Sequence, residues 1–127
     1  MSSFARRVFL FAGIYGLIVL VPQLFTESQI ARDYPPAITH PEYFYGFICT
    51  AIAWQLCFLV IARDPVRFRP IMLPSIAEKL AFSVPSLVLF LQHRLATITM
   101  AFASCDVVLG ALFFAAYLRT APDRITT

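Results

Sequence analysis

The chain has 127 residues, of which 60% are hydrophobic and 13% are charged, and its formal net charge at pH 7 is +3. A soluble domain is roughly half apolar and about a quarter charged, and a core of this length could not bury so much apolar surface. With a mean hydropathy of +0.78, the composition excludes an ordinary soluble domain and indicates a single integral membrane domain over residues 1–127.

The positive charge does not indicate a nucleic-acid partner, because seven of the ten basic residues flank apolar segments, where membrane topology explains them. Cys49 and Cys57 fall on one predicted helix about 12 Å apart at 1.5 Å rise per residue, too far for a disulfide. Cys105 lies inside another apolar block. We interpret all three as small buried residues, and we expect no metal site and no cofactor.

The first apolar run covers residues 8–25 and follows Arg6 and Arg7. It is long enough to cross a bilayer. An arginine pair before an apolar run also occurs in export signals, but no convincing cleavage site follows, so we interpret the pair as a cytoplasmic anchor. Ala12 and Gly16 have the spacing of a close helix–helix contact.

A polar connection over residues 26–42 separates the first apolar run from the second, which covers residues 43–62. Its prolines forbid a long helix, so the connection is predicted to lie on the surface. The aromatic opening of the second run suits a membrane interface. A stripe of small residues along this run predicts the close approach of a neighbouring helix. The stripe consists of Gly46, Thr50, Ala53 and Cys57.

A short basic hinge with Arg63, Arg67 and Arg69 leads into the third apolar run. These arginines are candidates for holding anionic lipid headgroups. The general excess of basic residues on the cytoplasmic side of membrane proteins explains them equally well.

The third and fourth apolar runs cover residues 72–91 and 98–118. Pro85 lies inside the third run and has no N–H, so we expect a kink there, with the Ala81 carbonyl bonded to a serine or water. One face of this run is polar, and Glu78 lies about 100° away from it. The polar face carries Ser75, Lys79, Ser83 and Ser86.

The basic residues also predict the orientation. The segments before the first run, between the second and third, and after the fourth carry two, three and two Lys or Arg, against Arg32 and Arg94 in the other connections. The positive-inside rule then places both termini in the cytoplasm. We predict an all-α, antiparallel four-helix transmembrane bundle, multi-pass in the bacterial inner membrane.

Polar residues recur inside the apolar runs, where a charge costs on the order of 3 kcal/mol even on the mildest scale. At about 1.5 Å per residue, Tyr15, Gln55, Glu78 and Lys79 come out at one depth, with Asp106 some 8 Å further along. Each predicted helix thus offers a polar group to one inner zone. These five residues are the candidate ligand-binding or polar-network residues.

Several interpretations of this zone remain open: a purely structural network, a pocket for a small ligand, or a proton relay or acid–base site. Neighbouring residues on a helix do not face each other, so Glu78 and Lys79 should be poor mutual partners. Lys79 has the reach for Asp106 or for the lipid headgroups on the cytoplasmic side. Glu78 could accept hydrogen bonds from Gln55, Tyr15 or a hinge arginine, or it could stay protonated. No nucleophile or cofactor motif accompanies these residues, so no catalytic residue is assigned.

The hinge A-R-D-P-V-R-F-R-P at residues 62–70, followed by Glu78-Lys79, resembles sequences in small bacterial four-helix membrane proteins grouped as DoxX-like. The likeness in layout covers most of the chain, and the specific motif covers residues 62–79. Some DoxX-like proteins are associated with quinone-linked electron transport or redox stress, so the resemblance implies a respiratory accessory role. It implies no catalytic residue.

We therefore expect a non-enzymatic membrane protein whose polar pocket binds a lipophilic small molecule or supports a partner membrane protein. The alternatives are an accessory subunit of a quinone-linked redox complex and a proton-coupled or catalytic acid–base site. A wide cavity lined by Glu78, Lys79 and Asp106 would favour the ligand. A dry bundle with an apolar outer face would favour the subunit. The phenylalanines are interpreted as packing bulk.

Overall fold

The computed structural model describes residues 2–121, which form four long helices and no strand. Each long helix, with its short 3₁₀ extension where present, makes a segment of 23 residues that is apolar enough to cross a membrane. Only 22% to 28% of each segment is buried inside the protein, which fits side chains that face lipid. In chain order the elements are α1 (Ser2–Leu20), η1 (Val21–Phe25), α2 (Glu27–Asp33), α3 (Pro41–Arg63), η2 (Arg69–Ile71), α4 (Met72–Leu91) and α5 (Thr97–Arg119).

The predicted spans are present, with small differences at their ends. The third span, α4, has the predicted bounds, and α3 and α5 extend slightly beyond theirs. The largest difference is at α1, which begins at Ser2 because the short polar head continues the helix. The connection over residues 26–42 holds no long helix, as predicted, although α2 occupies part of it.

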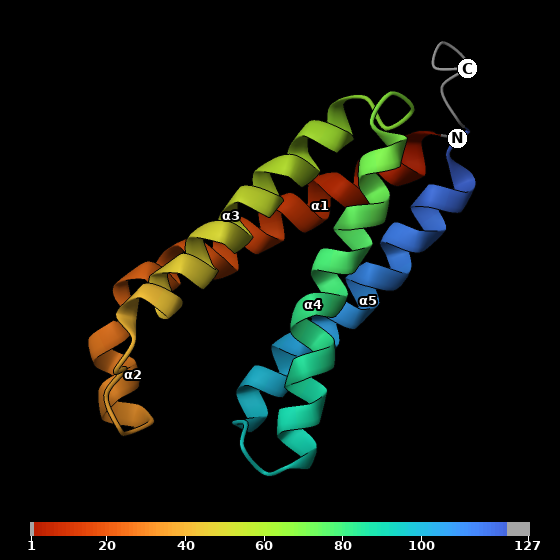
Figure 1. The fold of residues 1–127 in the computed structure, drawn as a ribbon. Coiled ribbons are helices and arrows are strands. Elements are labelled where there is room, and N and C mark those ends of the chain that lie inside the picture. Colours follow the sequence, from red (N-terminus) through yellow and green to blue (C-terminus); the bar gives the residue numbers. More distant parts are fainter. Residues whose placement is uncertain (1, 122–127) are drawn as a thin grey trace.

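The long helices lie side by side in two pairs, α1 with α3 and α4 with α5 (Figure 1). The two pairs meet at the end of the molecule that holds the N-terminus. They diverge toward the end that holds α2 and the turn between α4 and α5 (Figure 1). Contact between the pairs is mainly through α1 and α5, and α3 touches α4 sparingly. The helices therefore leave the α3–α4 side open.

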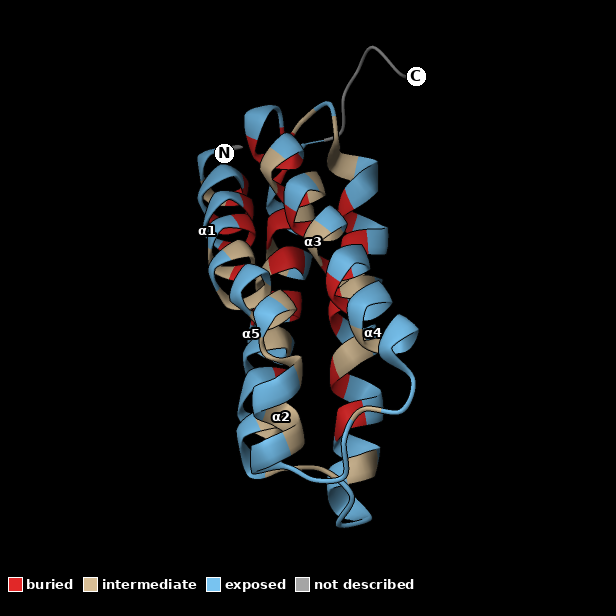
Figure 2. Cartoon of the chain, turned by 90° about the vertical axis from the view of Figure 1, so that its left-hand side faces the viewer, coloured by how far each residue is buried: buried red, intermediate tan, exposed pale blue. Residues whose placement is uncertain are grey.

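The core lies where the pairs meet. Figure 2 shows the buried residues concentrated toward the end that holds the N-terminus, whereas the end near α2 is mainly exposed. Three aromatic rings from three helices form its centre. The rings of Phe9 and Phe113 stack with their centroids 4.2 Å apart, and the ring of Phe58 meets Phe113 edge-on at 4.9 Å. Such ring pairs add to the free energy of burial, so α1, α3 and α5 are joined here.

Two arginines bind helix ends near this core. The Arg6 Nε donates a hydrogen bond to the Ala62 carbonyl at 3.1 Å, and the Arg69 Nε donates one to the Tyr117 carbonyl at 3.1 Å. The last carbonyls of a helix lack partners within that helix, and a cation there also interacts favourably with the helix dipole. Arg6 thus holds the end of α3 against α1, and Arg69 holds the end of α5 against the hinge.

The close approach predicted from the small-residue stripe of α3 is wrong at Gly46. A Cβ at Gly46 would meet no atom within 4 Å, and Thr50 and Ala53 are exposed. The tight contact is on another face, where the Gln55 side chain lies directly against Gly16 of α1. Small residues permit a close approach, but they do not specify which side of the helix is used.

Pro85 does not interrupt α4, which continues through it as one helix. Because Pro85 has no N–H, the Ala81 carbonyl loses its helical partner. The predicted serine partner is absent: within residues 2–121 no side-chain hydrogen bond reaches this carbonyl, and the Ser83 hydroxyl donates to the Lys79 carbonyl at 3.0 Å.

The two helical glycines Gly16 and Gly46 provide a matched test of this packing. Gly16→Leu would force a side chain into Gln55, so we expect the free energy of unfolding to fall by about 1–3 kcal/mol. Gly46→Leu should not lower it, because the site is open and glycine inside a helix already costs about 0.5–1 kcal/mol. Thermal unfolding in detergent measures both. Equal losses would show that α1 and α3 are not packed through Gly16.

Candidate functional site

Lys79 is the centre of the polar group inside the helices. Its side chain projects from α4 and is almost fully buried, with 4% of the residue exposed. The ammonium Nζ lies 3.6 Å from Glu78 Oε2 and 3.7 Å from Asp106 Oδ1 of α5. Gly110 of α5 lies close to the lysine stem, since a Cβ there would be 3.4 Å from the Cβ of Lys79, an ordinary van der Waals contact.

The expectation that Glu78 and Lys79 are poor partners is wrong. The rule about neighbouring helical residues concerns the directions of their Cα–Cβ bonds. Both side chains are long, and the four-carbon stem of lysine is flexible. The ammonium therefore reaches Glu78 beside it as well as Asp106 on the next helix.

Two aromatic rings complete the surroundings of the ammonium. The Lys79 Nζ lies 5.1 Å from the ring centroid of Phe58 on α3 and 6.0 Å from that of Phe113 on α5. Both distances fall in the range of cation–π attraction. From the sequence we interpreted the phenylalanines as packing bulk, because nothing in the spacing of the 13 phenylalanines shows which of them contacts a lysine. The sequence offered one indication, namely that a buried ammonium needs acidic groups or aromatic faces nearby.

Gln55 does not belong to this group, so the predicted convergence of polar residues from all the helices is wrong for α3. Only 1% of Gln55 is exposed, and its side-chain amide donates to the Ala51 carbonyl of its own helix at 2.9 Å. Its carbonyl oxygen lies against Gly16 and has no hydrogen-bond partner among the described residues. The rise per residue predicts how far along α3 Gln55 lies, but it does not show in which direction around the helix axis its side chain points.

Tyr15 lies on the α5 side of α1. Its hydroxyl approaches Cys105 and is close enough to Asp106 for electrostatic interaction, while its ring stacks on Phe11 at 5.9 Å. Of the five candidate residues, the structure therefore brings together Glu78, Lys79 and Asp106, with Tyr15 at the edge of the group.

The charges of this group do not balance. Among the described residues, two carboxylates share one ammonium, which leaves one negative charge if all three are ionised. Glu78 Oε2 is buried and has no hydrogen-bond partner among residues 2–121, because 3.6 Å to the ammonium is too long for a good hydrogen bond. An uncompensated buried charge is strongly unfavourable. Glu78 is therefore the group that a further proton, donor or cation would satisfy.

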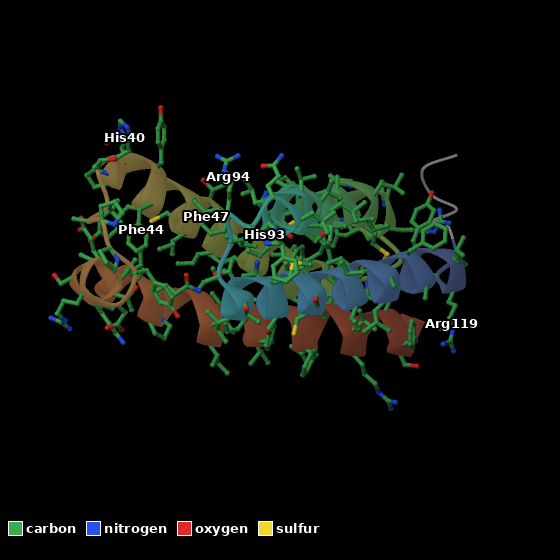
Figure 3. The ribbon with its side chains drawn as sticks, turned by 90° about the horizontal axis from the view of Figure 1, so that it is seen from below. His40, Phe44, Phe47, His93, Arg94 and Arg119 are labelled. Carbon is green, nitrogen blue, oxygen red and sulfur yellow. The ribbon has the colours of Figure 1, made fainter. Side chains whose placement is uncertain are left out.

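Glu78 also lines a groove of about 940 Å³ between α3 and α4, on the side where the helix pairs diverge. Lys79 and Asp106 do not line it. The rest of the lining is mainly apolar, and its other polar residues are Glu42, Thr50 and Ser86. The rings of Phe47 on α3 and Phe82 on α4 stack with their centroids 5.7 Å apart. Phe47 is labelled in Figure 3. Aromatic side chains from both helices line the groove: Tyr43, Phe47, Trp54 and Phe82.

The hinge arginines differ from one another. Arg63 and Arg67 are exposed, and the Arg67 guanidinium lies 5.5 Å from the ring of Phe68. Arg69 is partly buried and binds the end of α5. Two of the three candidates for anionic lipid thus face outward, and the third stabilises the fold.

Comparison of the chain with protein-family models, curated proteins and solved structures finds no match. Within residues 2–121, no three His, Cys, Asp or Glu side chains gather in a way that could hold a metal ion. The function must therefore be inferred from the geometry of the chain itself.

The contact between Lys79 and Asp106 predicts non-additive effects on stability. Lys79→Met should lower the free energy of unfolding by about 3 kcal/mol, because it leaves buried carboxylates without a cation. In the double variant with Asp106→Asn, the total loss should fall short of the sum of the single losses by about 1 kcal/mol or more. Thermal unfolding in detergent gives all three values.

The control is Ser104→Ala, a change at an exposed position of α5. When it is combined with Lys79→Met, the two losses of stability should be additive. Additivity in both pairs would rule out the coupling.

Proposed function

We propose that this chain is a non-enzymatic, multi-pass protein of the bacterial inner membrane that binds a lipophilic small molecule in the groove between α3 and α4. The observation that carries the proposal is the groove itself, which has about 940 Å³ of space, an apolar lining and one buried carboxylate at Glu78. Small-molecule sites have volumes of about 300–1,000 Å³ and combine apolar walls with few polar groups.

Of the three residues expected to line a ligand cavity, only Glu78 lines the groove. The groove still supports a ligand over a dry accessory subunit, which needs no internal space. In keeping with the DoxX-like resemblance, a quinone-linked complex would be one setting for such a protein. An acid–base reaction is less well supported, because the ammonium of Lys79 is held between two carboxylates.

In this proposal the long helices cross the membrane in alternating directions, with both termini and the hinge in the cytoplasm. The basic residues in the first turns of α1, in the hinge, and at and beyond the end of α5 support this orientation. The N-terminus, the hinge and the end of α5 lie at the same end of the molecule (Figure 1). The groove then opens sideways, toward the hydrocarbon of the bilayer, from which a lipophilic molecule could enter.

Cysteine labelling in intact cells tests the orientation. In a background without the native cysteines, a cysteine at Ser3 or at Thr127, which lies outside the described residues, should resist a membrane-impermeant maleimide. A cysteine at Ser28, an exposed position in α2, should react. Labelling of either terminal position from outside would contradict the proposed topology.

The single tryptophan of the chain, Trp54, lines the groove and reports whether it is occupied. In protein reconstituted into phosphatidylcholine nanodiscs, a bromoalkanol should quench Trp54 fluorescence in a saturable way, because bromine quenches only at short range. Gly46→Phe fills the groove without a clash at its Cβ and should remove the saturable part. Val60→Phe, on an exposed part of α3, should not. Unsaturable quenching that is the same in all three proteins would refute the proposed site.

A further inference from the structure

The charges and rings of the groove indicate which class of molecule it takes. Its described lining residues include two acids, Glu42 and Glu78, and several aromatic rings, but no Lys, Arg or His. We infer that the ligand is a lipophilic cation, namely an alkyl amine or ammonium whose charged head lies at Glu78. This inference rests on the proposed function and adds the chemical class of the ligand.

The missing positive charge is the first argument. Lys79 is the one cation in contact with both Glu78 and Asp106 among the described residues, so the ionised group carries one excess negative charge. Glu78 is the member that lines the groove, while its Oε2 is buried and faces the Lys79 ammonium at 3.6 Å. A ligand ammonium on the groove side of Glu78 would supply the missing charge. A ligand anion would add a second uncompensated charge.

The aromatic lining is the second argument. Aromatic faces attract cations through the ring quadrupole, and this is a common way of recognising amines and quaternary ammonium groups. The core of this protein already holds the ammonium of Lys79 in this manner, over the rings of Phe58 and Phe113. In the groove, Trp54 on α3 and Phe82 on α4 offer the same kind of surface.

The shape of the groove suits a long apolar tail. It extends along α3 from Glu42 to Trp54, a length of about 18 Å at 1.5 Å rise per residue. An alkyl chain could lie along this wall with its head at Glu78. Glu42 lies near the end of the groove that is proposed to face the periplasm, where a carboxylate attracts cations to the membrane surface.

The direct test compares two probes of equal chain length, a bromoalkyl amine and a bromoalkanol, by Trp54 quenching in phosphatidylcholine nanodiscs. The amine should bind the unaltered protein about tenfold more tightly than the alcohol, as expected for a charge-assisted hydrogen bond. Glu78→Gln should abolish this difference, and Glu78→Asp should keep most of it. Asp33→Asn, which removes an exposed carboxylate of α2, is the matched control and should leave the preference unchanged.

Each outcome has a distinct meaning. Both probes could bind with equal affinity and both be blocked by Gly46→Phe. The groove would then bind lipophilic molecules without selecting cations, so the inference would be wrong and the proposed function would stand. The same holds if the amine preference survives Glu78→Gln, because it then comes from the bilayer. If neither probe gives saturable quenching that Gly46→Phe removes, the proposed function fails as well. If Glu78→Gln does not fold, an equal affinity of the unaltered protein for both probes still refutes the inference.

Discussion

The arrangement of this protein depends on burying the ammonium of Lys79. A charge in an apolar interior is tolerated only when opposite charges and other polar partners surround it. Here the partners come from three helices: Glu78 on α4 itself, Asp106 on α5 and the ring of Phe58 on α3. Satisfying the ammonium therefore fixes how α4 is rotated and how it is aligned along α5, where Gly110 lies close to the lysine stem.

This constraint divides the molecule into two regions. On one side of Lys79, the rings of Phe9, Phe58 and Phe113 close the core, and Arg6 and Arg69 hold the helix ends. On the other side the helix pairs diverge, and the space between α3 and α4 stays open (Figure 1). Packing thus stabilises one end of the bundle, and the α3–α4 side stays open toward the other end.

Glu78 lies at the border between these regions. It contacts the lysine that organises the core, and it also forms part of the groove wall. A ligand that interacts with Glu78 would therefore change the electrostatic surroundings of Lys79 and, through it, of Asp106. Ligand binding and the stability of the helix contacts are coupled in such an arrangement, because a ligand that binds only the folded state also stabilises it.

Hydropathy by itself determined the four spans and their bounds to within a few residues at most ends, since any segment of that length and apolarity can cross a membrane. It also identified the residues too polar to face lipid, among them Glu78, Lys79 and Asp106. Only the tertiary structure decided how these residues combine: that Gln55 turns toward Gly16, that Glu78 reaches Lys79 beside it, and that Gly46 faces open space. Composition and spacing report depth and helical face, whereas partners depend on how each helix is rotated against its neighbours and how far a flexible side chain extends.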